Sequence, residues 1–217
     1  IGPGITAMVT GVTAAQKDHT DLMYRYFPLV ILYVVIATYL VLLVLFRSVV
    51  LPLKAVIMNA MSIFASYGAL VFIFQQGNFE GLLAFRSVGY TEATIPIIVF
   101  CIVFGLSMDY EVFLLSRIKE AYDETGDNTG SVAMGLEKTG RIITSAAIIL
   151  VLVAAAFATS DVIIVKAFGL ATAIAILLDA TAVRALLVPA LMRILGDWNW
   201  WAPRFLQRLL PQQRMAG

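Results

Sequence analysis

One carboxylate interrupts a long apolar stretch of the sequence. Asp109 follows a run without charged residues that begins at Thr94, and it stands eight residues before Arg117, about 12 Å along a helix. A carboxylate inside a membrane is costly, and it marks an ion pathway, a proton relay or a buried pair. Desolvation and a nearby cation act on such a group in opposite directions, so it can bind and release a proton near neutral pH.

The neighbours of Asp109 favour a site between helices. Tyr110 has a hydroxyl that can donate to the carboxylate or extend a proton wire. Small side chains fall at helical spacing on the side of Asp109 and permit close helix approach, so this stripe is expected to face protein. Its members are Cys101, Gly105 and Ser116. Glu111 lies about 200° around the helix from Asp109 and is expected to reach the interface. The alternative for Asp109 is a buried side chain held by a structural hydrogen bond.

Asp179 is a second carboxylate within an apolar stretch. It shares a stripe with the small residues Gly169, Thr172, Ala175 and Ala182. Arg184 follows five residues later, about 140° around an α-helix, so an ion pair within one helix is not expected. Arg184 should instead reach another helix or the lipid headgroups, and function and structural pairing remain equally open for both residues. Thr144 and Ser145 are candidate hydrogen-bond partners, although such hydroxyls often bond their own backbone.

Composition limits the classes of protein to which the chain can belong. It has 217 residues, of which 61% are hydrophobic and 13% charged, so lipid is the expected solvent. The net charge of +1 argues against nucleic-acid binding. One cysteine excludes a disulfide framework within the chain. We find no metal-spaced cluster and no phosphate-binding glycine-rich loop, so we expect no metal and no cofactor, and no ATP-driven pumping.

Five apolar stretches are long enough to cross a bilayer, which predicts an all-α membrane protein with a transmembrane domain over residues 27–195. The predicted spans are 27–46, 55–74, 94–116, 142–160 and 165–195. Residues 1–26 are expected to end an extracytoplasmic domain, and 196–217 to form a cytoplasmic tail with interfacial Trp and Arg. The first two spans form a tight hairpin, 75–93 form a mixed loop, and the polar stretch 117–140 is expected to lie in water.

Basic residues are unevenly distributed between the two sides of these spans. The hairpin, the polar stretch 117–140 and the C-terminal end carry most of the Lys and Arg. The positive-inside bias therefore predicts a multi-pass protein with a cytoplasmic C-terminus and an external N-terminal segment. The chain begins with Ile1 and has no signal-peptide pattern, so we interpret it as a piece of a longer protein.

Three strings in the sequence resemble the MmpL-type transporters of the RND (resistance-nodulation-division) superfamily. The string GLSMDYEVFLLSR (105–117) resembles their Asp-Tyr helix. TGRIITSAA (139–147) and LDATAVR (178–184), the latter followed by PAL (189–191) and WNWW (198–201), occur in the expected order. The first two spans match only in position and hydropathy.

The resemblance implies a fold and a function. The complete protein would have twelve helices in two repeats, and this chain would hold helices 8 to 12. Asp109 and Tyr110 would relay protons together with an equivalent Asp-Tyr helix in the missing N-terminal repeat. Arg117, Asp179 and Arg184 would belong to the same relay, with Thr144, Ser145 and Gly105 supporting it.

The protein would then be a secondary active transporter in a bacterial inner (plasma) membrane. The proton-motive force would drive the export of lipids, glycolipids, drugs or other hydrophobic compounds, with the proton as the coupling ion and the bilayer as a partner. The sequence makes no prediction of an oligomeric state.

Two other classes remain open. Intramembrane aspartyl proteases also have two aspartates within spans, but they place them in Tyr-Asp and Gly-x-Gly-Asp contexts, whereas here Tyr110 follows Asp109 and Leu178 precedes Asp179. A non-transporting Patched-like or sterol-sensing protein can share the transporter fold. Proton flux coupled to export would favour the transporter over both.

Overall fold

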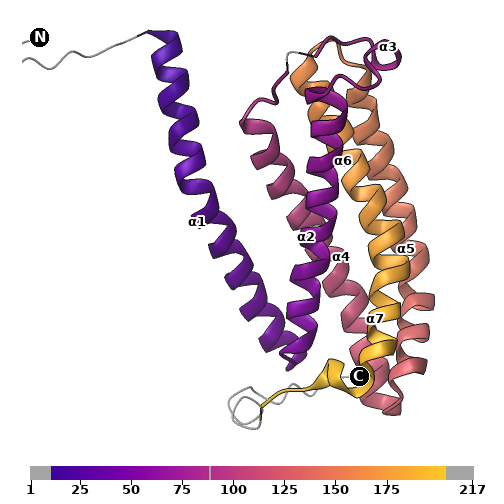
Figure 1. The fold of residues 1–217 in the computed structure, drawn as a ribbon. Coiled ribbons are helices and arrows are strands. Elements are labelled where there is room, and N and C mark those ends of the chain that lie inside the picture. The colour runs from indigo at the N-terminus through magenta and orange to yellow at the C-terminus, as the bar shows by residue number, and fades with distance from the viewer. Residues whose placement is uncertain (1–10, 88, 204–217) are drawn as a thin grey trace, which may run out of the picture. The chain divides into compact units, whose positions relative to one another are not determined.

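The computed structural model describes residues 11–87 and 89–203, and within these ranges it contains helices and connections but no strand (Figure 1). The chain divides into two units, Ile1–Ile36 and Ala37–Gly217. The described part of the first unit is the N-terminal portion of α1 (Val12–Phe46). Large apolar side chains such as Leu29 and Tyr33 are exposed on it. A helix that is apolar on all sides is typical of a membrane span or of the core of a larger protein.

The second unit contains the end of α1 and all later elements. These are α2 (Val50–Leu70), the π-helical turn η1 (Val71–Gln75), α3 (Glu80–Leu83), α4 (Thr94–Thr125), α5 (Asn128–Ala156), the short 3₁₀ turn η2 (Phe157–Thr159), α6 (Ile163–Leu178), the π-helical segment η3 (Asp179–Leu187), α7 (Val188–Leu195) and the 3₁₀ turn η4 (Gly196–Trp200). Five continuous helical stretches in the described residues have the length and composition of membrane spans. The predicted number of spans and the all-α class are therefore confirmed.

The helices extend beyond the predicted spans. Residues 12–26 continue α1, so 27 is not a helix boundary; residues 1–10 lie outside the described residues, and their assignment to an extracytoplasmic domain stays a prediction. The polar stretch 117–140 is helical except for a short connection, because its charges pair along the helix surface, as Arg117 does with Glu120 at 2.7 Å. Gly126, with a φ of 68°, ends α4, and the Asp127 carboxylate accepts the Thr129 and Gly130 backbone N–H groups at 3.0 Å.

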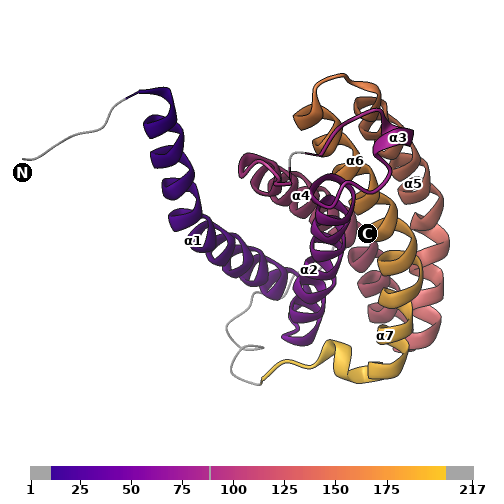
Figure 2. The ribbon, with the colours of Figure 1, turned by 45° about the horizontal axis from the view of Figure 1, so that its top comes forward.

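Helix α6 lies at the centre of the second unit, where it contacts α2, α4 and α5, and α4 and α5 also pack against each other (Figure 2). Two glycines permit close approach. A Cβ at Gly169 would lie 2.6 Å from the Ala154 carbonyl oxygen, and one at Gly135 would lie 3.2 Å from the Ile118 Cα. At these crossings the backbones of two helices pack directly against each other, because a glycine has no side chain to separate them. Together these contacts fix α2, α4 and the α6–η3 helix in a defined register.

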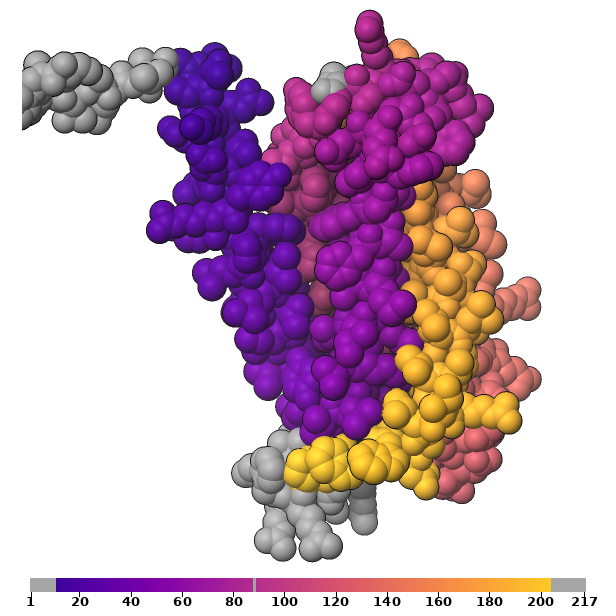
Figure 3. All heavy atoms as spheres, viewed as in Figure 1, coloured from indigo at the N-terminus to yellow at the C-terminus, as the bar shows by residue number. Residues whose placement is uncertain are grey.

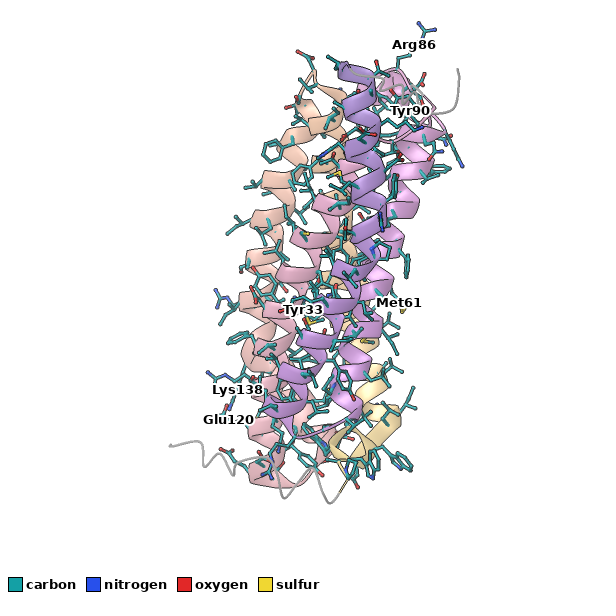
Figure 4. All side chains as sticks on the ribbon, turned by 90° about the vertical axis from the view of Figure 1, so that its left-hand side faces the viewer. Tyr33, Met61, Arg86, Tyr90, Glu120 and Lys138 are labelled. Atoms are coloured by element: carbon teal, nitrogen blue, oxygen red, sulfur yellow. The ribbon has the colours of Figure 1, made fainter. Side chains whose placement is uncertain are left out.

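Exposed charged side chains project at both ends of the second unit. In Figure 4, Glu120 and Lys138 project at one end, while Arg86 and Tyr90 mark the opposite end. At the Arg86 end, Lys166 is buried and donates to the Leu83 and Ala84 carbonyls that close α3. The predicted loop 75–93 therefore contains one helical turn held by a lysine from α6.

At the Glu120 end, the segment after α7 closes the bundle. Asn199 is fully buried, and its amide donates to the Met192 and Gly196 carbonyls at 2.7 Å. The backbone carbonyl of Asn199 accepts a hydrogen bond from the Ser48 hydroxyl at 2.6 Å. The Trp200 ring stacks on the Tyr122 ring, with their centroids 4.3 Å apart. This part of the predicted tail is therefore packed against the bundle, while residues 204–217 lie outside the described residues.

Candidate functional site: a buried charge cluster

An ion pair between Asp179 and Arg184 forms within one helical stretch, in the π-helical segment η3. The prediction that the two residues would not pair was wrong because it assumed α-helical geometry. A π-helix has i→i+5 hydrogen bonds and a wider turn than an α-helix, so residues five apart lie on the same side of the helix. Both side chains are buried, with 9% of Asp179 and 5% of Arg184 exposed. The π-helical backbone is thus the local structure that brings this acid and this base together.

Side chains and carbonyls of two other helices complete the surroundings of the ion pair. The Ser62 hydroxyl of α2 donates to the second Asp179 carboxylate oxygen at 3.3 Å. Arg184 also donates to the Ser107 carbonyl of α4 at 3.1 Å, which confirms that it reaches another helix. The Arg184 guanidinium lies over the Tyr110 ring, 5.3 Å from its centroid. The pair is therefore held by α2 and α4, as a charge pair removed from water must be.

Lys54 of α2 and Glu111 of α4 are two further buried ionisable groups, with 6% and 5% of their surfaces exposed. They interact electrostatically with each other, and Glu111 also interacts with Arg184 and Asp179. We call these four residues the charge cluster. The prediction that Glu111 reaches the interface was wrong, because Glu111 is buried on the side of α4 opposite Asp109, and α4 packs against α2 and α6.

A buried polar stripe on α2 escaped the sequence interpretation. Lys54, Asn59, Ser62 and Ser66 are all buried. Asn59 and Ser66 donate to the Phe104 and Ala171 carbonyls at 3.4 Å and 3.0 Å. The steps of three and four residues between Asn59, Ser62 and Ser66 are a signal that places these three residues on one side of a helix. An interpretation based on hydropathy alone misses this signal, because the stretch that contains these polar residues is predominantly apolar.

Asp109 and Gly105 are exposed on α4, facing away from the charge cluster and uncovered by the other described helices of the second unit. The sequence predicts contact with protein on this side of α4, and no other described helix of the second unit provides that contact. The described structure gives the Asp109 side chain no hydrogen bond or ion pair, whereas the adjacent Tyr110 is half-buried beside Arg184. Arg117 is exposed and pairs with Glu120, so nothing in the described structure joins it to the cluster.

The predicted supporting hydroxyls lie elsewhere. Thr144 and Ser145 are exposed on α5 and make no hydrogen bond to Asp109, Asp179 or Arg184 in the described structure. Thr144 instead lines an apolar groove of about 460 Å³ between α5 and η3. These residues face away because α5 packs through its other side, where Ile143 is buried.

A model of the MMPL family matches residues 1–213. The chain belongs to the MMPL family. Three similar proteins are the mycolic acid-containing lipids exporter MmpL11 of Mycolicibacterium smegmatis (44% identity over 97% of this chain), the trehalose monomycolate exporter MmpL3 of Mycobacterium tuberculosis (43% over 95%) and the heme uptake protein MmpL11 of Mycobacterium tuberculosis (45% over 94%). The matched regions make up 22%, 22% and 21% of these relatives. The family predicted from the Asp-Tyr, Thr-Gly-Arg and Leu-Asp strings is thus confirmed.

This MMPL-family chain spans about a fifth of the length of its relatives. Residues that the remaining four fifths contribute to the site therefore lie outside this structure. The site residues of this chain form two groups that meet at Tyr110. One group is the charge cluster inside the bundle, and the other is Asp109 on the open face of α4. The helix numbers 8 to 12 and the equivalent Asp-Tyr helix outside this chain stay predictions.

Proposed function

We propose that the complete protein uses the proton-motive force to export lipids or other hydrophobic compounds, and that Asp109 and Tyr110 relay the coupling proton. The observation that supports this most directly is the contact between Arg184 and Tyr110. It joins the helix that carries Asp109 to a buried ion pair. A change of charge at Asp109 can therefore be transmitted to groups that hold α2, α4 and η3 together.

Protonation of Asp109 would remove one negative charge beside Tyr110 and so change the field at the Arg184 guanidinium. The Asp179–Arg184 pair would respond, because buried charges are poorly screened. The pair is held by Ser62 of α2 and the Ser107 carbonyl of α4, so its rearrangement would shift these helices. A charge that crosses the membrane potential supplies about 2.3 kcal/mol per 100 mV, which can drive such a shift.

The relatives support the class of cargo. Two of them are named as exporters, one of mycolic acid-containing lipids and one of trehalose monomycolate, and a third is named for heme uptake. The common chemistry is a large, largely hydrophobic molecule moved across or out of a membrane. We therefore propose lipid export as the function, with the substrate contacts lying mostly in the parts of the relatives that this chain does not match.

The proposed location is a bacterial inner membrane with the C-terminus in the cytoplasm. The basic residues Lys119 and Lys138 lie on the halves of α4 and α5 that lead to their connection, and the packed segment around Asn199 belongs to the same end of the bundle. The positive-inside bias favours placing this end in the cytoplasm. Addition of a membrane-impermeant label to single cysteines at either end would test this orientation.

Export by the full-length protein tests the proposed function. The Asp109→Asn variant keeps the size of the side chain but cannot cycle a proton, so lipid export is expected to fall to background. Asp161→Asn is a matched control, because Asp161 is an exposed aspartate in the turn before α6. Normal export by Asp109→Asn at equal protein abundance would refute the relay.

The same experiment separates the alternative classes. A Patched-like or sterol-sensing protein without transport would show no export in the parent chain. An intramembrane protease would cleave a membrane-spanning peptide with dependence on both Asp109 and Asp179. The names of the relatives, which describe exporters and transport proteins, favour a transporter over the protease.

A further inference from the structure

Lys54 and Glu111 carry polar atoms that are buried without a direct partner. The Lys54 Nζ atom and the Glu111 Oε1 atom are inaccessible to solvent and make no hydrogen bond in the described structure. Their charged atoms are not within the 4.0 Å of a direct ion pair, although the two groups attract each other electrostatically. The two charged groups are therefore more than 4.0 Å apart and still close enough to interact electrostatically.

Such an arrangement is costly unless something lies between the two groups. A buried polar atom without a hydrogen bond destabilises a protein by about 1–3 kcal/mol, and an unpaired buried charge by more. An internal water molecule forms two to four hydrogen bonds with groups of this kind. An ammonium group supplies three donors and a carboxylate supplies acceptors, so the pair offers what a bridging water needs.

The pair of Lys54 and Glu111 lies between the middle of the bundle and its α1–α2 end. Lys54 lies just beyond the first turn of α2, close to Ser48, which bonds the Asn199 carbonyl at the end of the bundle. Ser62, the partner of Asp179, lies eight residues further along α2, about 12 Å by the helical rise. The charge cluster thus extends along the bundle, from Asp179 at its middle toward the α1–α2 turn.

We propose that Lys54 and Glu111 form a water-bridged acid–base pair that holds the coupling proton on its way from the Asp179–Arg184 pair to the α1–α2 end of the bundle. This inference rests on the proposed proton coupling. The bridging water gives one proton to the Glu111 carboxylate as it accepts the coupling proton from the Asp179 side of the path, so it remains neutral water and Glu111 becomes a neutral acid. Glu111 later releases this proton to water on the side of the α1–α2 turn, which restores its carboxylate. Lys54 remains an ammonium group and stabilises the carboxylate between these steps.

Three charged or titratable groups face Glu111 from the elements packed against it. They are Lys54 on α2 and Asp179 and Arg184 on η3. The two acids and two bases balance each other, so the cluster has no net charge when all four are ionised. Addition of one proton to Glu111 leaves a net positive charge inside the bundle, and this charge favours release.

A set of variants of the full-length protein separates proton transfer from a purely structural role. Lys54→Met and Glu111→Gln each leave one buried group without its partner, so each is expected to lower the thermal stability. The Lys54→Met/Glu111→Gln double variant removes both charges and should regain most of that stability. Its proton-coupled export should nevertheless remain about a hundredfold or more below the parent, as expected for loss of a positioned proton-transfer group.

Export by the double variant at the parent rate would overturn the inference, because the pair would then be structural. Glu137→Gln is the matched control, since Glu137 is an exposed glutamate on α5, and it should export normally. Infrared spectroscopy supplies a second readout, because the carboxylic-acid band of a protonated Glu111 should appear with falling pH and be absent in Glu111→Gln. Identical pH-dependent spectra for the two proteins would also contradict the inference.

The Asp109→Asn variant, assayed alongside, distinguishes the two hypotheses. If Asp109→Asn loses export while the double variant exports normally, the proposed function stands and the role of Lys54 and Glu111 is refuted. If Asp109→Asn exports normally, the proton relay itself is refuted, and the inference that rests on it falls as well.

Discussion

The close packing of α4 against α5 at Gly135 predicts a strong effect of adding one methyl group there. A Cβ there would lie 2.4 Å from Ile118 Cγ1 and 3.1 Å and 3.2 Å from the Ile118 backbone N and Cα. Carbon atoms in contact normally lie about 3.5–4.0 Å apart. The Ile118 side chain would have to move by about 1 Å, and the two helices would have to separate by several tenths of an ångström. Overpacking of this kind costs about 1–3 kcal/mol.

The Gly135→Ala change also brings a small gain in stability, since alanine stabilises a helix interior by about 0.5–1 kcal/mol relative to glycine. Gly140→Ala is the matched control, because Gly140 lies on the same helix with nothing within 4 Å of its Cβ position. Thermal unfolding of the purified full-length proteins should show Gly135→Ala below the parent and Gly140→Ala at or above it. Equal unfolding temperatures for the two variants would refute the packing argument.

Three further variants test individual contacts. Arg184→Met leaves Asp179 buried without its cation, so it should lower stability by about 3–5 kcal/mol, and an additional Asp179→Leu change should restore most of this loss; failure of the double variant to recover in thermal unfolding would contradict the ion pair. Asn199→Leu removes the amide that joins α7 to η4, and hydrogen exchange should become faster in residues 196–203, whereas unchanged protection would argue against the contact. Lys166→Met should speed proteolysis at α3, because it removes the cation that binds the Leu83 and Ala84 carbonyls; unchanged cleavage would contradict that role.

Much of the fold follows from the sequence because lipid imposes simple rules. A long stretch without charges must be a helix, since each backbone hydrogen bond has to be satisfied within the segment. The five spans and the family follow from this rule and from the Asp-Tyr string. The boundaries do not follow, because a helix such as α4 continues into polar sequence when its own charges pair along its surface.

The candidate site is less predictable because it depends on a local departure from α-helical geometry. The pairing of Asp179 with Arg184 requires the π-helical segment, and no residue between them marks such a segment in advance. The role of Glu111 likewise depends on which side of α4 is covered, and that is decided by the packing of α2 and α6. Lys54 was predictable in part, because the polar residues that follow it on α2 recur at helical spacing.

The central claim is that Asp109 carries a proton whose movement drives transport. Reconstitution of the full-length protein into liposomes with an internal pH-sensitive dye measures this movement directly when a proton gradient and substrate are present. We predict substrate-dependent proton flux for the parent and for Asp161→Asn, and no flux above that of empty liposomes for Asp109→Asn. Parent-level flux through Asp109→Asn would contradict the claim.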